Sequence, residues 1–479
     1  MRQQARPTRE NRTITVDFQN EATYFQLLGD GKAFVEFVIA FLLALGFQLA
    51  HKATCRGGGC LTRHSHYARV RLGGLTIWRV QCTTCRAVFT VLPHFVLRSR
   101  QMRPDIARDA LLATHGGLSL ELCAVLSHIS PMALYRLVCA FGHQNLVTVL
   151  TRCGLPLPVY FLADEKHSRC LAAKVYLPTI VSGRVIWHLG CTEEASAVAF
   201  TQSYRVFQQA ALQQDPSYRV RGILTDGFDS TTSSMRALFP GARLGTCLRH
   251  AINKLPGKLT AIATPVRKAL RSQFHTLLYR ARQRQGLRVF ALGQRLRHFV
   301  DHVATTAGTA NGERVRRWFR EKKAGWYAVL EDPQMPATST LLDQAHNAIE
   351  RKLFAMKGLH HPGGSQQAFL TGLAHLYNLI PYQRRAQHAG QCGVEVEGGK
   401  VPTRDWFLNL QILTSGGLQC APGVLPGRAG GYPPGPPTDP YVRNERIRFL
   451  GNQSLGTALA HHCAALHGQS DGMDDPGYG

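Results

Sequence analysis

Three acidic residues, Asp164, Asp226 and Glu350, lie in or just after segments that would bring them together in a folded chain. Carboxylate oxygens are ligands that Mg²⁺ prefers in proteins. Two such ions, held about 3.5 to 4 Å apart, stabilise the attacking and leaving oxygens of a phosphodiester that is being cleaved. The three acids therefore predict a site for Mg²⁺ (or Mn²⁺) and phosphodiester chemistry.

The segments around the first two acids have the pattern of buried strands. VYFLAD is an apolar run ending in Asp164, and RVRGILTD is another ending in Asp226. Between them, AAKVYLPTIV and RVIWHLG flank a Ser182-Gly183 turn like a hairpin, and EEASAVAFTQSYRVFQQAAL has helical periodicity. A helix to Phe239 and a short strand around Leu244 follow. This order matches an RNase H-like fold, in which the ends of the first and fourth strands are neighbours.

Two further acids compete for the first two positions. Glu165 is adjacent to Asp164, but consecutive strand residues face opposite sides of a sheet, so only one should enter the site. Asp229 immediately precedes Ser230 and a helical run, where a capping role is natural. Asp164 and Asp226 are therefore the expected ligands.

The motif CLRH at Cys247–His250, after an LFPGARLG approach, carries a resemblance to a known family. It resembles the C(2)H signature of Mutator-like and related bacterial insertion-sequence transposases of the DDE type. The order of motifs across residues 158–385 is also similar, including a helical insertion before a late catalytic Glu. The resemblance implies that Glu350 is the third acid, with Asn347 shortly before it in a supporting role.

Alternatives remain for these assignments. Asp343 lies seven residues before Glu350 on the same predicted helix and faces a similar direction, so helical geometry does not exclude it. Cys247 and His250, three residues apart, are either core residues or support for the metal site, because two ligands do not complete a zinc site.

Four cysteines in two closely spaced pairs predict a zinc ribbon. Two pairs of thiolates can hold one tetrahedral Zn²⁺, and YARVRLGGLTIWRVQC between them alternates like strands. His64 or His66 is an alternative ligand, and buried cysteines without a metal are the competing interpretation. The predicted zinc ligands are Cys55, Cys60, Cys82 and Cys85.

The charge of the chain favours a polyanionic partner. Its 479 residues include 56 Lys or Arg against 30 Asp or Glu, a formal charge of +26, and nucleic acid is the leading candidate. Residues 254–323 carry 17 Lys or Arg and three acids, with apolar residues interleaved at helical spacing, which predicts packed helices with a cationic face. The expected DNA contacts are Arg98, Arg100, Arg103, Arg280, Arg282, Arg284, Arg316 and Arg317. Trp318, Phe319 and Trp326 are either core or base-stacking residues.

Residues 104–143 read as three short helices with the spacing of a helix-turn-helix. Pro104 can start the first helix, Gly116-Gly117 ends it, and Ser130-Pro131 supplies an N-cap and first residue for the third. The third helix carries only Arg136 among cationic residues, so a purely structural three-helix bundle is an equal alternative.

The apolar segment Ala33 to Ala50 is at the short limit for a membrane span, and Glu36 lies inside it. A buried core or oligomerisation helix is the preferred interpretation. We therefore expect no membrane association, and a cytoplasmic, bacterial nucleoid-associated protein.

The sequence thus predicts a multidomain α+β chain that binds double-stranded DNA, both transposon ends and target, as a homodimer or larger assembly. A non-catalytic DNA-binding protein derived from a transposase and an RNase H-like nuclease without strand transfer are the alternatives. The expected domains are an N-terminal region with an apolar helix (1–50), a zinc ribbon (51–97), a helix-turn-helix-like domain (98–146), the first part of an RNase H-like α/β catalytic core (158–250), a basic α-helical insertion (251–338), the final core helices (339–390) and a Pro/Gly-rich C-terminal tail (391–479).

Overall fold

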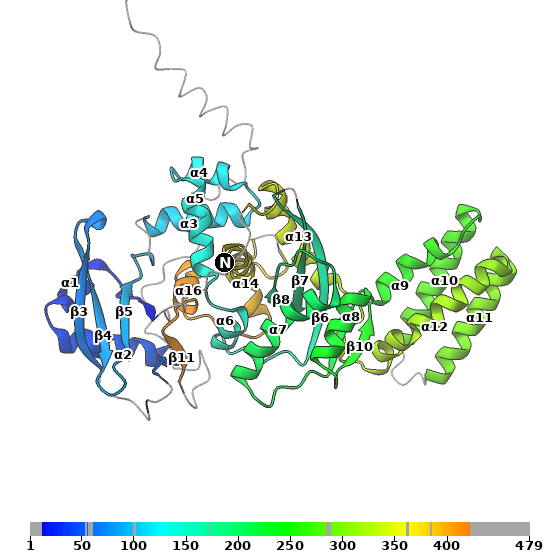
Figure 1. The fold of residues 1–479 in the computed structure, drawn as a ribbon, viewed down its shortest axis with the longest axis horizontal. Helices are drawn as coiled ribbons and strands as arrows, with labels where there is room; N and C mark the ends of the chain where they lie inside the picture. Colours follow the sequence, from blue (N-terminus) through cyan, green and yellow to red (C-terminus); the bar gives the residue numbers. More distant parts are fainter. Residues whose placement is uncertain are drawn as a thin grey trace, which may run out of the picture. The chain divides into compact units, whose positions relative to one another are not determined.

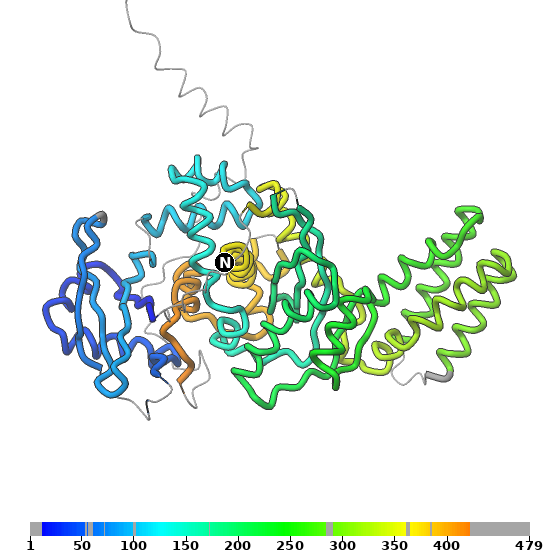
Figure 2. The backbone as a smooth tube through the Cα atoms, in the orientation of Figure 1, coloured from blue at the N-terminus to red at the C-terminus, as the bar shows by residue number. Residues whose placement is uncertain are grey.

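The computed structural model shows a mixed α/β chain that divides into two units, Met1–Ala429 and Gly430–Gly479. The residues that it describes are drawn in colour in Figure 2. They are 12–52, 55, 61–98, 102–171, 173–283, 289–360, 364–383 and 386–421, so the second unit lies outside them.

The N-terminal part is a four-stranded sheet with two helices. The strands run in the order β1 (Thr13–Val16), β5 (Val88–Pro93), β4 (Leu75–Cys82) and β3 (Leu61–Arg69). β1 pairs parallel to β5, whereas β3, β4 and β5 pair antiparallel, and the 3₁₀ turn η1 (Val70–Leu72) leads from β3 towards β4. The segment before the predicted ribbon therefore completes the sheet.

Two helices, α1 (Glu21–Leu28) and α2 (Gly31–Ala44), precede the ribbon strands. Helix α2 buries Phe34, Val38 and Phe41, so the apolar segment is a core helix, as preferred from the sequence. It ends earlier than expected, because the chain turns at Gly46, with φ 76°, into β2 (Phe47–Leu49).

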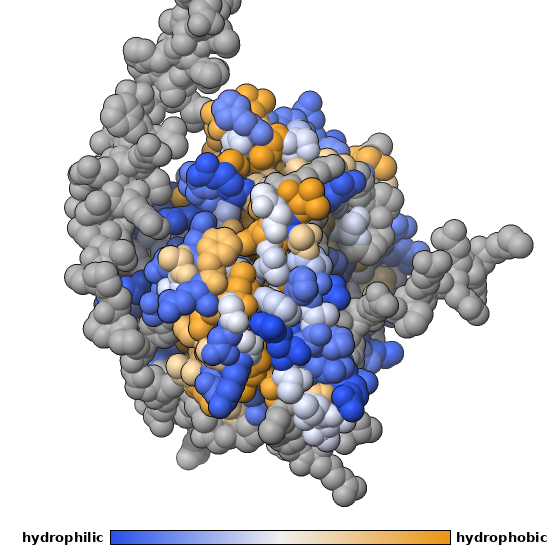
Figure 3. Space-filling model, turned by 90° about the vertical axis from the view of Figure 1, so that its left-hand side faces the viewer, coloured by the Kyte–Doolittle hydropathy of each residue, from blue (hydrophilic) through white to orange (hydrophobic). Residues whose placement is uncertain are grey.

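The side of the molecule viewed in Figure 3 mixes hydrophilic residues with scattered apolar ones.

Among the described residues, no single helix is long and apolar enough to cross a membrane. One pair of helices, Leu120–Leu126 and Pro131–Phe141, passes the same test of length and composition together, but it is bent by 107°.

The expected helices of residues 104–143 are present, with a fourth after them. They are α3 (Pro104–His115), α4 (Leu120–Leu126), α5 (Pro131–Phe141) and α6 (Leu146–Arg152). Ser130 caps α5 by accepting a hydrogen bond from the Ala133 amide, as its position before Pro131 predicted. Helix α5 packs against α14 (Gly364–Leu379), where Tyr135 stacks on Phe369 with centroids 4.7 Å apart. Its buried face favours the structural bundle over a free recognition helix.

The central sheet has five strands in the order β10-β9-β6-β7-β8. Strands β6, β7 and β8 form an antiparallel meander, and β9 and β10 add parallel to β6 on its other side. Their bounds are β6 Tyr160–Cys170, β7 Ala173–Ser182, β8 Val185–Leu189, β9 Gly222–Thr225 and β10 Arg243–Thr246. The sequence of three strands, a helix and a further strand is confirmed.

Helices cover this sheet on both faces (Figure 1). Helices α7 (Ala197–Gln214) and α8 (Asp229–Leu238) pack on one face, and α13 (Thr340–Ala355) packs on β6 and β7 from the other. The faces are distinguished by consecutive residues of β6: the Glu165 side chain contacts α8, whereas Lys166 contacts α13.

Between β10 and α13 the chain forms a helical insertion. Its elements are α9 (Leu248–Lys254), the 3₁₀ turn η2 (Leu255–Lys258), α10 (Thr264–Gln283), α11 (Val289–Ala307) and α12 (Thr309–Glu331). An aromatic cluster fills its interior, where Phe274 lies 5.3 Å from Phe319 and 5.8 Å from Trp326 between ring centroids. The predicted packed helices are therefore present.

Residues 391–421 are part of the fold, in contrast to the expected tail that begins at 391. They contain α15 (Gly393–Val396), α16 (Trp406–Leu413) and β11 (Leu418–Cys420), and β11 pairs antiparallel with β2. The buried Arg152 guanidinium donates to the carbonyls of Leu413, Ser415 and Leu418 and so fixes this segment to α6. The remainder of the expected tail lies outside the described residues.

Candidate active site

Asp164 and Asp226 lie on neighbouring parallel strands of the central sheet. Leu162 of β6 is in register with Leu224 of β9. Asp164 lies two residues after Leu162, and Asp226 lies two residues after Leu224. Asp164 belongs to β6, and Asp226 directly follows β9. The structure therefore brings the first two predicted acids to the same place.

The environment of Asp164 disfavours its charged form. Burial raises the pKa of Asp164 well above its usual range, and the nearby charges of Asp226 and Glu165 raise it further. Asp226 is held by the Phe228 amide, which donates to its Oδ1 at 2.6 Å. Two crowded carboxylates of this kind are the donor set that a divalent cation would neutralise.

Glu165 faces α8, as strand alternation predicted. The hydroxyl of Thr231 donates to its Oε2. Burial raises the pKa of Glu165 to about 7 despite this hydrogen bond, and the charge of Asp226 contributes to the shift. Glu165 therefore influences the charge of the acid pair from the opposite face.

Asp229 does not cap α8 in the way the sequence predicted. It is the first residue of the helix, whereas Phe228 occupies the N-cap position and makes no side-chain cap hydrogen bond. The Asp229 side chain is 93% exposed, and its Oδ1 lies 3.5 Å from Lys322 Nζ. The capping prediction was wrong because the helix begins one residue earlier than expected.

An open pocket of about 500 Å³ separates β6 from the first half of α13. It is lined by Asp164, Glu165, Lys166, Arg249, Thr340, Asp343, Gln344, His346 and Asn347. The supporting residue Asn347 is therefore placed at the pocket, and Arg249 is a further cation there.

Asp343 lines this pocket, whereas Glu350 does not. The two acids face similar directions, but seven residues at about 1.5 Å rise place them roughly 10 Å apart along the helix axis. Glu350 instead pairs with Lys166, with 2.9 Å between Nζ and Oε2. Of the two third-acid candidates, Asp343 is the one that shares a pocket with Asp164.

Cys247 and His250 connect the insertion to the start of α13. Cys247 Sγ accepts from the Ser339 amide at 3.3 Å, and Ser339 Oγ lies 3.4 Å from His250 Nδ1. Burial opposes ionisation of Cys247, but hydrogen bonds with His250 and Ser339 lower its pKa overall. The hydrogen bond with Cys247 raises the pKa of His250 against burial, and the charges of Asp226 and Asp164 add to this. The motif thus anchors the residue before α13 and places the His250 imidazole near the acids.

A second group of ligand atoms lies at the edge of the N-terminal sheet. His51, Cys55, Cys82 and Cys85 each offer one atom, all within 4.8 Å of one another, and could hold a metal ion. The Sγ atoms of Cys55 and Cys82 are 4.0 Å apart, and Cys85 Sγ lies 3.6 Å from His51 Nδ1. Three thiols and one imidazole are a donor set that suits Zn²⁺.

The ionisation of Cys85 supports metal binding. Burial acts to raise its pKa, but hydrogen bonds from the Lys52 backbone and the His51 ring outweigh it and lower the pKa to about 6. A thiolate, rather than a thiol, is the form that binds a metal.

The ligand set differs from the predicted one in its fourth member. Cys60 lies outside the described residues, and His51 completes the described group instead. The alternative ligand His66 packs against Trp78, with 4.6 Å between ring centroids, and is not part of this group. His51 lies four residues before Cys55. This His–Cys spacing is a sequence signal for the ligand, which a prediction from cysteine pairs alone does not use.

Arg282 has a structural role that the sequence did not predict. Its guanidinium donates to the carbonyls of Val329, Asp332, Pro333 and Met335 at 2.6 to 2.9 Å. These bonds satisfy carbonyls at the end of α12 and in the following turn. Arg282 was therefore wrongly grouped with phosphate contacts, because its donors are already engaged.

The other predicted DNA contacts in the insertion vary in their surroundings. Arg280 and Arg317 are exposed, and Arg316 is exposed but lies 3.2 Å from Asp301. Arg284 lies outside the described residues. Trp318, Phe319 and Trp326 are buried, which rules out the base-stacking alternative for them.

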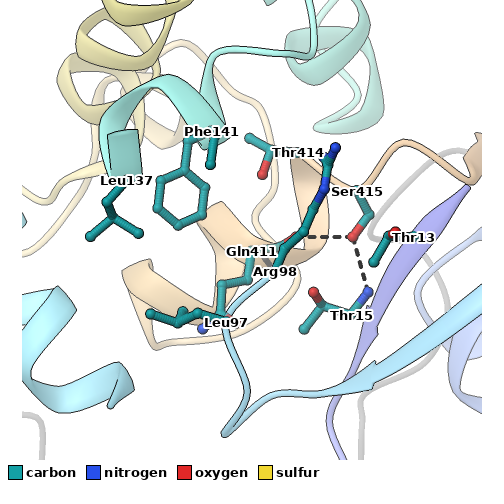
Figure 4. Close-up of a pocket in the computed structure, with 10 residues that line it drawn as sticks. Thr13, Thr15, Leu97, Arg98, Leu137, Phe141, Gln411, Thr414 and Ser415 are labelled. Atoms are coloured by element: carbon teal, nitrogen blue, oxygen red, sulfur yellow. Dashed lines mark hydrogen bonds between the residues drawn. The ribbon is translucent and has the colours of Figure 1, made fainter. Parts of the chain in front are cut away.

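Near the N-terminal sheet, Arg103 is exposed and pairs with Asp105 at 2.6 Å, and Arg100 lies outside the described residues. Arg98 is half-buried and lines a small pocket (Figure 4). There, Ser415 Oγ accepts from the Thr15 amide and donates to the Gln411 carbonyl. Arg98 is thus placed between β1, α5 and α16 rather than on an open surface.

A comparison with models of known protein families and with curated proteins finds no match to this chain. The site is therefore interpreted from its own geometry.

Proposed function

We propose that this protein is a transposase that binds the ends of an insertion sequence and catalyses divalent-metal-dependent DNA strand cleavage and strand transfer. The observation that carries the proposal is the adjacency of Asp164 and Asp226, where burial and then the charge of Asp226 raise the pKa of Asp164. A buried carboxyl that has a raised pKa, lines a pocket and has further acids beside it is a feature of catalytic sites rather than of ordinary surfaces.

The topology of the central sheet supports an RNase H-like core. An antiparallel meander followed by two parallel strands on its first member gives the order β10-β9-β6-β7-β8. Asp226 directly follows the fourth strand, β9, whereas Asp164 lies within the first, β6, which continues to Cys170. The register of Leu162 with Leu224 still makes the two acids neighbours.

The residues present fit Mg²⁺ or Mn²⁺. Asp164 and Asp226 supply hard oxygen ligands whose mutual repulsion a divalent cation relieves. When bound, such ions stabilise charge on the attacking and leaving oxygens of the phosphodiester. The protein's own contribution is to hold the two carboxylates at fixed positions on adjacent strands.

Asp343 is the third acid that we propose, in place of Glu350. It lines the same pocket as Asp164, and the contacts of Cys247 with Ser339 fix the start of its helix. Glu350 keeps its pairing with Lys166, which makes it part of the support of α13.

The reaction consists of two phosphoryl transfers. In the first, a water oxygen bonds to phosphorus while the phosphorus–O3′ bond breaks, and the strand leaves as a 3′-hydroxyl. In the second, that 3′-hydroxyl oxygen attacks a phosphodiester of target DNA, whose own 3′ oxygen leaves. Both steps need a positioned phosphate and a cationic surface around it.

The helical insertion and the N-terminal modules would hold the DNA. Exposed arginines such as Arg280 and Arg317 supply sequence-independent phosphate contacts. The ribbon sheet, stabilised by Zn²⁺ at His51, Cys55, Cys82 and Cys85, would contribute to recognition of the ends. Two ends must be joined in one reaction, so a homodimer or larger assembly on DNA is the expected active form.

One experiment separates the three candidate functions. Purified protein is incubated with Mg²⁺ or Mn²⁺, a duplex carrying the DNA that flanks its reading frame, and a supercoiled target plasmid. Cleavage with joining to the plasmid supports a transposase. Cleavage without joining indicates a nuclease, and retention of the duplex without cleavage indicates a non-catalytic DNA-binding protein.

A further inference from the structure

The acid that follows β9 is in contact with a lysine from the helical insertion. Lys254, the last residue of α9, places Nζ 3.4 Å from Asp226 Oδ2 and 3.2 Å from the Asp226 carbonyl oxygen. The Asp226 side chain is 22% exposed and that of Lys254 is 49% exposed. The ammonium therefore holds both the side chain and the backbone of one proposed metal ligand.

A second lysine of the insertion contacts the same segment two residues on. Lys322 of α12 donates to the Gly227 carbonyl at 3.3 Å, and its Nζ lies 3.5 Å from Asp229 Oδ1. Two helices of the insertion thus hold residues 226–229, but only Lys254 reaches the Asp226 carboxylate.

The position of Lys254 has an electrostatic consequence. A carboxylate oxygen that accepts from an ammonium is partly neutralised, and a cation approaching it meets a like charge at short range. At Asp164, by contrast, Oδ1 accepts from the backbone amide of Glu165, and His250 acts on this acid through its charge. Lys254 therefore opposes cation binding at one of the two acids.

We propose that Lys254 is the counter-ion of the Asp226 carboxylate in the metal-free protein and is displaced when a divalent cation binds. This displaceable ion pair is called the latch below. The inference rests on the proposed function, because it takes Asp226 as a metal ligand. Lys254 is a positioning residue here. Its displacement links metal binding to a movement at the end of α9, and frees an ammonium beside the metal site.

The test is a titration of the full-length, DNA-free protein with Mn²⁺, with free Mn²⁺ measured by electron paramagnetic resonance. Lys254→Met keeps the length of the side chain and removes its charge. It should tighten Mn²⁺ binding by about fivefold, the modest effect expected for a partly exposed ion pair. Lys254→Arg keeps the charge and should bind Mn²⁺ as the wild type does.

Lys322→Met is the matched control, because it removes an ammonium from the same segment without altering the partner of Asp226. It should change Mn²⁺ affinity by less than twofold. If Lys254→Met binds Mn²⁺ no more tightly than wild type, while Asp226→Asn still weakens binding, the latch is overturned and the metal site stands. If Asp226→Asn leaves Mn²⁺ affinity unchanged, the metal site and the latch both fail.

Discussion

The Lys166 ammonium of β6 lies 2.9 Å from the Glu350 carboxylate of α13. Lys166 is two residues beyond Asp164 on β6, so both side chains face α13. The strand therefore presents the Asp164 carboxyl group towards the first half of α13 and the Lys166 ammonium towards its second half. Glu350 pairs with Lys166, whereas Asp343, on the same side of the helix, lines the pocket that Asp164 also lines.

The engaged guanidinium of Arg282 predicts a stability effect. Arg282→Ala removes donors from four backbone carbonyls, most of them part-buried, and should destabilise the protein by about 1 to 3 kcal/mol, since such acceptors left unpaired are costly. Arg280→Ala, on the exposed side of α10, should change stability by less than about 0.5 kcal/mol. Thermal or urea unfolding measures both. Equal effects of the two substitutions would contradict the structural role.

Exposed arginines of the insertion should act on DNA affinity without sequence preference. The double substitution Arg280→Gln and Arg317→Gln should weaken binding to all duplexes by similar factors and reduce the slope of log affinity against log salt by about 2. Fluorescence anisotropy over a range of salt concentrations measures this. Loss of affinity for one sequence only would identify these residues as base readers.

The metal centre of the N-terminal sheet should hold about one Zn²⁺ per chain. Cys82→Ser with Cys85→Ser should remove the metal, and His51→Ala should lower its occupancy, because these residues belong to the ligand group. His66→Ala is the control, since His66 packs against Trp78 outside the group. Elemental analysis of purified protein measures occupancy. Metal-free wild-type protein that is folded and binds DNA normally would remove the centre from the account.

The raised pKa of Asp164 predicts that Mn²⁺ binding strengthens as the pH rises. Burial and the charges of Asp226 and Glu165 favour the protonated acid in the folded protein, and the proton must leave before the carboxylate can bind a cation. Lowering the pH should therefore weaken binding, because it protonates Asp164, whose pKa is raised well above its usual range. Glu165→Gln removes one like charge and should move the transition to lower pH. A pH-independent affinity in wild type would contradict this.

The sequence was most informative where local chemistry decides structure. Pro104 and the Ser130-Pro131 pair set two helix starts through capping and a fixed φ, and both were predicted correctly. The order of strands was likewise readable, because each apolar run ends at a polar residue or a turn. Long-range arrangements were not readable: nothing local indicates that β1 pairs with β5 or that β11 pairs with β2.

The same distinction explains the candidate site. Asp164 and Asp226 were predicted from the apolar runs that precede them, but β6 continues past Asp164 to Cys170, so this acid lies within its strand. Alternation correctly directed Glu165 towards α8, although Glu165 also lines the pocket beside Asp164. The choice between Asp343 and Glu350 depends on the position of α13 along the sheet. Packing and the contact of Cys247 with Ser339 set this position. The sequence alone does not distinguish Arg282 from the other arginines of a basic helix, because its carbonyl partners become its neighbours only in the folded chain.

The most direct test of the account compares four single substitutions in cleavage and joining of cognate ends with Mg²⁺. Asp164→Ala, Asp226→Ala and Asp343→Ala should each reduce activity by at least about 10³-fold while DNA binding persists, because each removes a proposed metal ligand rather than a phosphate contact. Glu350→Ala should retain activity within about tenfold, because it loses only an exposed pair with Lys166. An inactive Glu350→Ala with an active Asp343→Ala would contradict our third-acid assignment, and wild-type cleavage by the Asp164 and Asp226 variants would contradict the enzyme itself.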